Sequence, residues 1–229
     1  MKQILAFVVL ALSVVVARAD FVIQQKVESA EQNGIITLKF KGDQLRTDMP
    51  TERVGDVSII RDLKTGDTIT MIHRQKLARK ESGAEYKQRL EQMDNGTPDT
   101  VISKPVDTGK MERVGNYDTE IYTWTNSSHM GGTFWLARDY PDYPKIRSLY
   151  LKLEQPPAGQ ISKRTAPDIS ALPGMVVKSK SESPTGEITK TLISAKEEPV
   201  AASDFQIPAD YRVLGLVVTP GHPISPPNH

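Results

Sequence analysis

Short runs of alternating apolar and polar residues restrict the fold of this 229-residue chain more than any other feature. After the turn-forming pair Asn33-Gly34, the apolar residues Ile36, Leu38 and Phe40 alternate with polar ones. A period of two is typical of a strand that buries one face. Similar runs, separated by turn-forming residues, recur over residues 21–80, which favours antiparallel hairpins over βαβ units.

The same pattern predicts further strands along the chain. We expect strands near residues 21–27, 36–41, 44–49, 57–61, 68–73, 110–114, 119–125, 133–137, 175–180 and 187–194. Residues 94–108 contain prolines and turn-forming pairs and predict a loop between two strand-rich halves, which are too short to bury separate cores. We therefore expect one domain over residues 20–214 and a disordered, proline-rich tail over residues 215–229.

Two helices are predicted between these strands. Ser82 and Glu85 have the spacing of a capping box, and Tyr86, Leu90 and Met93 follow them as one apolar stripe. The second helix has its apolar residues at helical spacing as well: Ile146, Leu149, Tyr150 and Leu153.

Residues 1–19 have the three parts of a secretory signal peptide. Lys2 is followed by an uncharged apolar run over residues 4–16 and then by small residues at the cleavage positions. The run is too short to cross a bilayer core of about 30 Å, which argues against a retained membrane anchor. We expect cleavage between Ala19 and Asp20, which leaves a soluble periplasmic or extracellular protein without a membrane span.

Charge and cysteine content narrow the class of protein. The formal net charge is only +1 and both signs are interspersed, so the chain lacks the basic surface that nucleic acids or anionic membranes attract. The chain has no cysteine, and residue 20 is an aspartate where a bacterial lipoprotein carries the cysteine of its lipid anchor. Without disulfides, a fold outside the cytoplasm has to rely on its core alone.

The motifs do not favour metal binding or covalent catalysis. The four histidines, His73, His129, His222 and His229, lack the spacing that directs two ligands at one ion. The Gly-x-Ser-x-Gly and Ser-x-x-Lys motifs of serine nucleophiles are missing from the sequence. We therefore predict no metal, no cofactor and no catalytic residue.

Aromatic residues are concentrated in residues 122–143, where both tryptophans lie on neighbouring predicted strands. If these strands form a hairpin, Trp124 and Trp135 are positioned to share a face. One interpretation is that Trp124, Phe134 and Trp135 are ordinary core beneath the second helix. The other is that they line an apolar cavity.

The stretches 117–124 and 132–141 resemble an uncharacterised family of secreted bacterial proteins with a domain of unknown function. The late segment 203–211, in which Phe205 and Ile207 precede a proline and a tyrosine, is similar to the closing motif of these domains and of the LolA/LolB-like lipoprotein-carrier fold. The resemblance implies a mainly β, α+β fold. Its strongly curved antiparallel sheet would form a half-open barrel, with two or three helices covering the concave side, where members of the wider fold carry acyl chains or other apolar ligands.

We therefore expect an exported, non-enzymatic envelope protein that binds a hydrophobic small molecule or lipid inside the curve of its sheet. The expected ligand-binding residues are Trp124, Phe134, Trp135, Leu38, Phe40, Tyr86, Leu90 and Met93. One alternative is a solidly packed interaction module for another envelope protein, which would lack a pocket of roughly 300 Å³. The other is an envelope hydrolase, which would need a polar cluster such as His73 beside a buried carboxylate.

Overall fold

The computed structural model describes residues 20–30, 32–94, 102–127, 130–154, 167–183 and 186–214, without the side chains of residues 90–94, 154 and 183. The predicted signal peptide, His129 and the predicted tail with His222 and His229 lie outside these residues. The side chains of Leu90 and Met93 also lie outside them.

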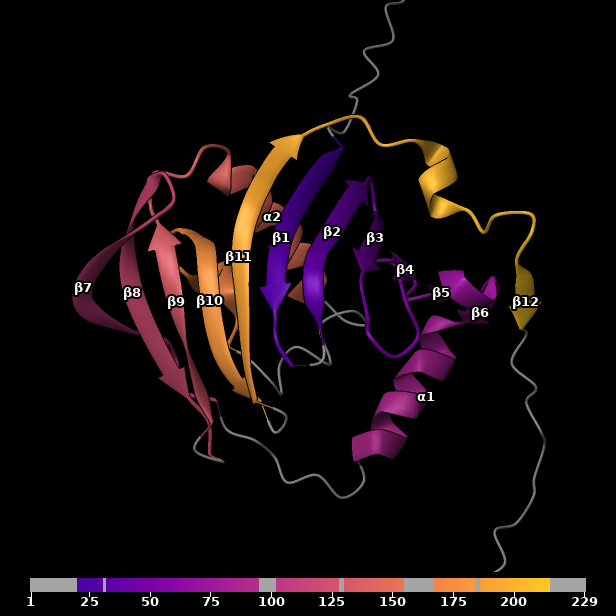
Figure 1. The fold of residues 1–229 in the computed structure, drawn as a ribbon, viewed down its shortest axis with the longest axis horizontal. Helices are drawn as coiled ribbons and strands as arrows, with labels where there is room; N and C mark the ends of the chain where they lie inside the picture. The colour runs from indigo at the N-terminus through magenta and orange to yellow at the C-terminus, as the bar shows by residue number, and fades with distance from the viewer. Residues whose placement is uncertain are drawn as a thin grey trace, which may run out of the picture.

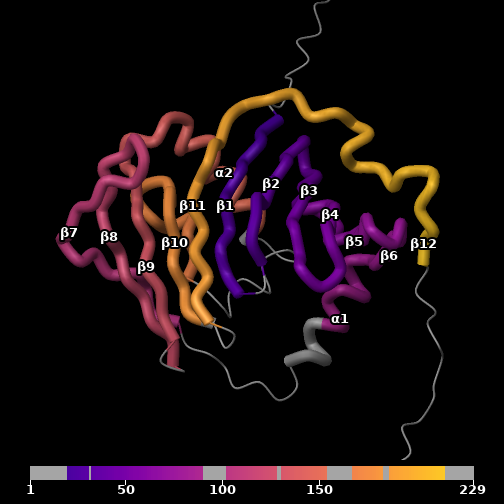
Figure 2. The backbone as a smooth tube through the Cα atoms, viewed as in Figure 1, coloured from indigo at the N-terminus to yellow at the C-terminus, as the bar shows by residue number. Residues whose placement is uncertain are grey.

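The described strands form one sheet of 12 strands, in the order β12-β6-β5-β4-β3-β2-β1-β11-β10-β9-β8-β7. Figures 1 and 2 show the strands following one another around an arc, with α2 behind the central strands. All neighbouring pairs are antiparallel except β12 and β6, which are parallel. The predicted fold class, a curved and mainly antiparallel sheet with helices, is therefore confirmed; in the described part the sheet is open, with β12 and β7 as its edges.

The strands of the first half are β1 (Phe21–Glu28), β2 (Asn33–Lys41), β3 (Gln44–Met49), β4 (Val57–Asp62), β5 (Thr68–Ile72) and β6 (Leu77–Glu81). Those of the second half are β7 (Val106–Val114), β8 (Tyr117–Thr125), β9 (Gly131–Ala137), β10 (Met175–Ser183), β11 (Gly186–Glu197) and β12 (Arg212–Leu214). The helices are α1 (Gly83–Asp94) and α2 (Tyr143–Glu154), with short 3-10 turns η1 (His73–Gln75), η4 (Ile169–Ala171) and η5 (Ala202–Phe205). Neither α-helix among the described residues is long and apolar enough to span a bilayer.

Both predicted helices form where the local signals place them. Ser82 and Glu85 make the predicted capping box: the Ser82 backbone N–H donates to Glu85 Oε2 at 2.7 Å, and the Glu85 N–H donates to Ser82 Oγ at 3.3 Å. On α2, Ile146 and Tyr150 are buried, which confirms its predicted apolar stripe. Lys152 ties the end of α2 to the β2–β3 turn, because its Nζ donates to the Gly42 carbonyl at 3.0 Å.

Strand β1 is buried on both faces at the centre of the sheet. Phe21 and Ile23 point toward the α2 side and are 2% and 0% exposed, whereas Val22 points to the opposite side and is 7% exposed. β1 pairs with β2 on one edge and with β11 on the other. This strand therefore joins the two halves of the chain into one sheet.

The opposite face is covered by residues 198–214, which we call the C-terminal segment. Its Val200 and Phe205 are buried in a cluster with Val22, Ile60 and Met71 of the sheet. The segment ends in β12, whose parallel pairing with β6 adds an edge strand. Figure 1 shows the segment running from β11 across to the far edge of the sheet. The sequence pattern did not predict this strand, because only Arg212–Leu214 take part in it and all three are exposed.

Two other expectations were wrong in detail. The predicted loop 94–108 overlaps β7, which begins at Val106. The start of β7 was not predicted because the side chains of this strand are exposed almost throughout and show no alternation of burial. Trp124 and Trp135 do not share a face: Trp124 pairs with Gly132, three residues before Trp135, so alternation directs the two indoles to opposite sides.

The C-terminal segment should contribute to stability through its buried aromatic ring. We predict that Phe205→Ala lowers the free energy of unfolding by about 3 kcal/mol, because it leaves a cavity over Met71 and Ile60. Urea unfolding followed by tryptophan fluorescence measures this change. Gln206→Ala, at the exposed next position, is the matched control and should change it by less than about 0.5 kcal/mol. Equal effects of the two substitutions would contradict this role of Phe205.

Candidate functional site

The main core lies between α2 and the sheet. Buried residues from β1, β2, β3, β9 and β10 form one cluster with two side chains of α2 and two loop residues, Leu63 and Tyr140. The full cluster is Phe21, Ile23, Phe40, Leu45, Leu63, Trp135, Ala137, Tyr140, Ile146, Tyr150, Met175 and Val177. Burial raises the pKa of the Tyr150 hydroxyl well above its usual range. The side of the sheet that carries Phe21, Ile23, Phe40 and Leu45 is called the α2 face below.

The residues expected to bind the ligand do not converge on one place. Phe40 and Trp135 belong to the main core, and Leu38 packs against it. Trp124 and Phe134 belong to a separate cluster with Leu136 and Leu172, in which the two aromatic rings are 6.4 Å apart. Trp124 and Phe134 are therefore buried on the opposite side of the hairpin from Trp135, and not together with it beneath α2.

Tyr86 anchors α1 to the same face that α2 covers. Its hydroxyl accepts a hydrogen bond from Arg61 Nη2 at 3.0 Å, and the Arg61 guanidinium lies 4.8 Å from the centre of its ring. Arg61 is the register partner of Leu45 in the main core, which places α1 over the α2 face. Arg89 adds a second tie, donating from Nε and Nη2 to the two carboxylate oxygens of Glu81 at 2.8 and 2.9 Å.

Half-buried apolar side chains continue the α2 face beyond the two helices. Leu38 of β2 is paired with Thr47 of β3, which is in turn paired with Ile59 of β4. On the other side of β1, Leu192 of β11 is paired with Gln25. Leu38, Ile59 and Leu192, called the apolar row here, keep part of their surface exposed, and Leu38 and Leu192 pack against the main core. Such a surface can accept further apolar contacts.

A hollow of about 430 Å³ lies at one end of this face, and we call it the end hollow. Its described lining is Ser29, Ala30, Gln32, Met49, Thr51, Glu52, Arg53 and Ile188. Met49 follows Leu45 by four residues on β3, and Ile188 precedes Leu192 by four on β11, so alternation keeps both on the α2 face. The volume lies within the range of small-molecule sites.

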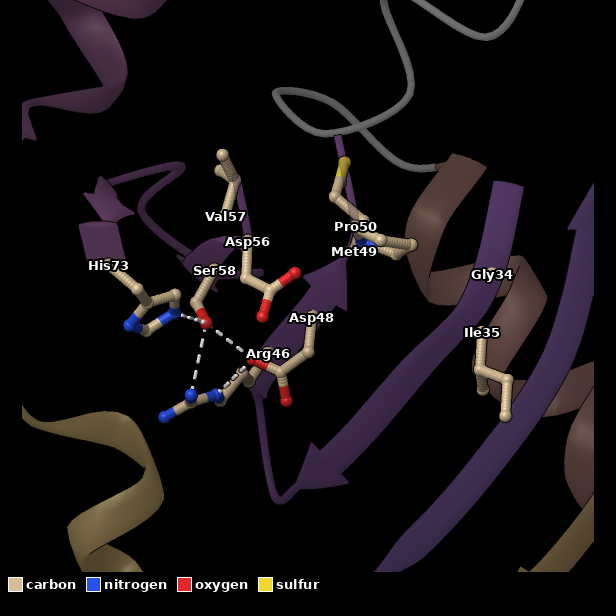
Figure 3. Close-up of a pocket in the computed structure, with 10 residues that line it drawn as sticks. All are labelled: Gly34, Ile35, Arg46, Asp48, Met49, Pro50, Asp56, Val57, Ser58 and His73. Atoms are coloured by element: carbon tan, nitrogen blue, oxygen red, sulfur yellow. Dashed lines mark hydrogen bonds and ion pairs between the residues drawn. The ribbon is translucent and has the colours of Figure 1, made fainter. Parts of the chain in front are cut away.

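A polar network occupies the opposite face, beneath the C-terminal segment (Figure 3). Ser58 is fully buried, and its Oγ lies 2.6 Å from His73 Nε2 and donates to Asp48 Oδ1 at 2.5 Å. Arg46 donates to Ser58 Oγ at 3.0 Å, to Asp48 at 2.7 Å and to the Asp204 carbonyl at 2.6 Å. The network therefore joins β3, β4 and η1 to the C-terminal segment.

The same residues line a hollow of about 450 Å³, which we call the polar hollow. Its lining is Gly34, Ile35, Arg46, Asp48, Met49, Pro50, Asp56, Val57, Ser58 and His73. Within the described ranges, no three His, Asp or Glu side chains gather closely enough to hold a metal ion.

The direction of the protons in this network is unsuitable for a serine nucleophile. The Ser58 hydroxyl donates to Asp48, so His73 Nε2 acts as a donor toward Ser58, while His73 Nδ1 lies 2.5 Å from the Tyr211 hydroxyl. A base that activates serine must instead accept its proton. Because Ser58 is also 0% exposed, the arrangement is better suited to fastening the C-terminal segment than to attacking a substrate.

Sequence reasoning named His73 but did not select its partners. The β3–β4 and β4–β5 pairings bring Ser58 and Asp48 close to His73. Tyr211, which follows His73 by 138 residues, reaches it through the C-terminal segment. The end hollow was not predicted either, because it is formed by turn residues, by Met49 at the end of β3 and by Ile188 from a distant strand. The feature of the sequence that could have indicated this hollow is Ile188, an apolar residue in a strand of mostly polar ones.

Comparison with protein-family models gives a match over residues 22–211 to the model described as Domain of unknown function (DUF4412). Among solved structures, the chain is similar to the lipoprotein LppX of Mycobacterium tuberculosis, at 10% identity and a TM-score of 0.41, covering 80% of this chain and 88% of that one. It is also similar to LprF from Mycobacterium bovis, at 9% identity and a TM-score of 0.35, covering 85% of this chain and 90% of that one. The curated proteins give no match.

The Glu81–Arg89 tie predicts a pH-dependent hold of α1 on the sheet. The hydrogen bond from Arg89 lowers the pKa of Glu81 below its ordinary value of 4.5. The stabilisation is therefore complete above that value and is lost as the pH falls through the folded-state pKa. We predict that Glu81→Gln lowers the free energy of unfolding by about 2 kcal/mol at pH 7 and by much less at pH 3.

Urea unfolding at the two pH values measures both changes. Glu28→Gln, which alters the exposed pair with Lys26, is the control and should change stability by less than about 1 kcal/mol at either pH. A loss for Glu81→Gln that is the same at pH 3 and pH 7 would show that the carboxylate charge is not what holds α1.

Proposed function

Since the chain belongs to the family described as Domain of unknown function (DUF4412), we propose for this member that it is an exported envelope protein that binds a hydrophobic ligand, such as a lipid or acyl chain, without acting on it as an enzyme. The ligand lies on the α2 face, along the apolar row and into the end hollow. The observation that carries this proposal is that the half-buried apolar side chains Leu38, Ile59 and Leu192 lie on the same face of the sheet as a hollow of about 430 Å³.

Physical chemistry favours an apolar occupant for this face. Leu38, Ile59 and Leu192 keep solvent-accessible surface on the face that carries the packed core, and covering apolar surface stabilises by about 25 cal/mol per Å². Among the described residues, α1 and α2 leave this surface partly uncovered, whereas the C-terminal segment covers Val22, Ile60 and Met71 on the opposite face. An acyl chain on the α2 face would remove the remaining apolar surface from water.

Export supports the same proposal from the sequence side. Residues 1–19 have the pattern of a signal peptide, and the chain has no cysteine for a lipid anchor after it. A cysteine-free chain of nearly neutral charge is suited to carrying an apolar molecule in an aqueous compartment outside the cytoplasm.

Two substitutions on one strand test the location. Leu38 and Ile35 lie on opposite faces of β2, Leu38 in the apolar row and Ile35 at the polar hollow. We predict that Leu38→Gln weakens the binding of dodecanol by about tenfold, because a buried amide would meet the alkyl chain. Ile35→Gln is the matched control and should leave binding unchanged. Tryptophan fluorescence titration measures both affinities.

A second measurement identifies a natural ligand. Protein purified from the cell envelope is extracted with organic solvent, and the extract is analysed by mass spectrometry for lipids. Weaker binding by Ile35→Gln alone would contradict the α2 face as the site. If no lipid is extracted and no fluorescence response is seen, hydrophobic-ligand binding is wrong, and the solidly packed interaction module becomes the better explanation.

A further inference from the structure

Lys190 of β11 differs from the other lysines near the centre of the sheet in having no partner among the described residues. Lys26 is bonded to Glu28, Lys180 to Glu187, and Lys196 to Glu198. Within the part of the chain that the structure describes, these pairs leave Lys190 as a cation without a counter-ion. The two carboxylates closest to it in register, those of Glu28 and Glu187, are already engaged with other lysines.

The pairing of β11 with β1 places Lys190 on the α2 face. Its register partner on β1 is Val27, which is 0% exposed and has the same alternation as Ile23 of the main core. On β11 its same-face neighbours are Ile188, which lines the end hollow, and Leu192, which belongs to the apolar row. Lys190 therefore lies directly between the two parts of the proposed ligand site.

The surroundings of Lys190 are those of a group inside a concave space. Its side chain keeps exposed surface, and yet enclosure by protein lowers the pKa of its ammonium below the usual range, with desolvation as the only cause. A side chain inside a hollow can keep solvent-accessible surface while the surrounding protein desolvates its charged group. A charged group without a partner in such a place costs free energy, and an anion beside it would remove that cost.

We propose that Lys190 binds the anionic head of an amphiphilic ligand whose apolar chain lies along the apolar row. The proposal rests on the proposed function and specifies its ligand class: a single-chain amphiphile with a carboxylate or phosphate head, in preference to a neutral lipid. Both heads offer oxygen acceptors to an ammonium group, which binds them as a point charge. The side chain of Leu192, two residues away on the same face, contacts the first part of the chain.

The experiment compares three ligands with the same alkyl chain: dodecanoate, dodecyl phosphate and dodecanol, each below the concentration at which it forms micelles. Affinities are measured by tryptophan fluorescence titration and calorimetry for the full-length protein and for Lys190→Met, which keeps a stem of similar length and removes the charge. Lys196→Met is the matched control. It removes the same charge from the same strand, and because Lys196 pairs with Val22 it points to the opposite face.

We expect the unsubstituted protein to bind at least one of the two anions about tenfold more tightly than dodecanol. Lys190→Met should abolish this preference and leave the affinity for dodecanol unchanged, whereas Lys196→Met should preserve the preference. The anion whose affinity exceeds that of dodecanol by the larger factor identifies the preferred head as carboxylate or phosphate. Thermal unfolding of each variant checks that the fold is retained.

Two outcomes would overturn the inference, and they differ from the outcome that would overturn the proposed function. If dodecanol binds as tightly as both anions, or if Lys190→Met keeps the preference for an anion, Lys190 does not hold the head while the hydrophobic site stands. If none of the three ligands binds, the site on the α2 face itself is wrong.

Discussion

The pairing of β1 with both β2 and β11 is the interaction on which the rest of the structure depends. It joins the first hairpins of the chain to the last one, so that 12 strands form one sheet. It also fixes two faces at once, because Ile23 is buried against the α2 side while Val22 is buried beneath the C-terminal segment. A slip of one residue in this pairing would exchange these side chains and expose both clusters.

The two faces that β1 separates are covered by different means. On one side, Phe205 and Val200 seal an apolar cluster, and Arg46 and His73 add hydrogen bonds that hold the C-terminal segment. Such ties serve where a cysteine-free chain has no disulfide to fasten its end. On the other side, contacts such as that between Arg61 and Tyr86 hold α1 over the α2 face. Half-buried apolar side chains remain on this face at Leu38, Ile59 and Leu192.

Local patterns predicted those parts of the fold whose causes are local. The alternation of Ile36, Leu38 and Phe40 predicted β2, and the Ser82–Glu85 spacing predicted the start of α1, because each signal lies within a few residues. The edge strand β12 and the Ser58–His73 contact depend on pairings between distant segments. The faces of Trp124 and Trp135 could not be predicted either, because one residue of register decides between sharing a face and opposing one.

Lys190 was the hardest residue to recognise from sequence, for a physical reason. In an alternating strand a lysine normally marks the solvated face, and Lys178 and Lys180 on the neighbouring strand strengthen that impression. The pairing of Lys190 with the fully buried Val27 indicates the opposite: Lys190 lies on the face of β11 that Val27 shares on β1. The half-exposed apolar row and Lys190, which has no partner among the described residues, are two unfavourable features of one surface. A ligand with an apolar chain and an anionic head removes both of them in a single binding step, whereas a neutral lipid removes only the first.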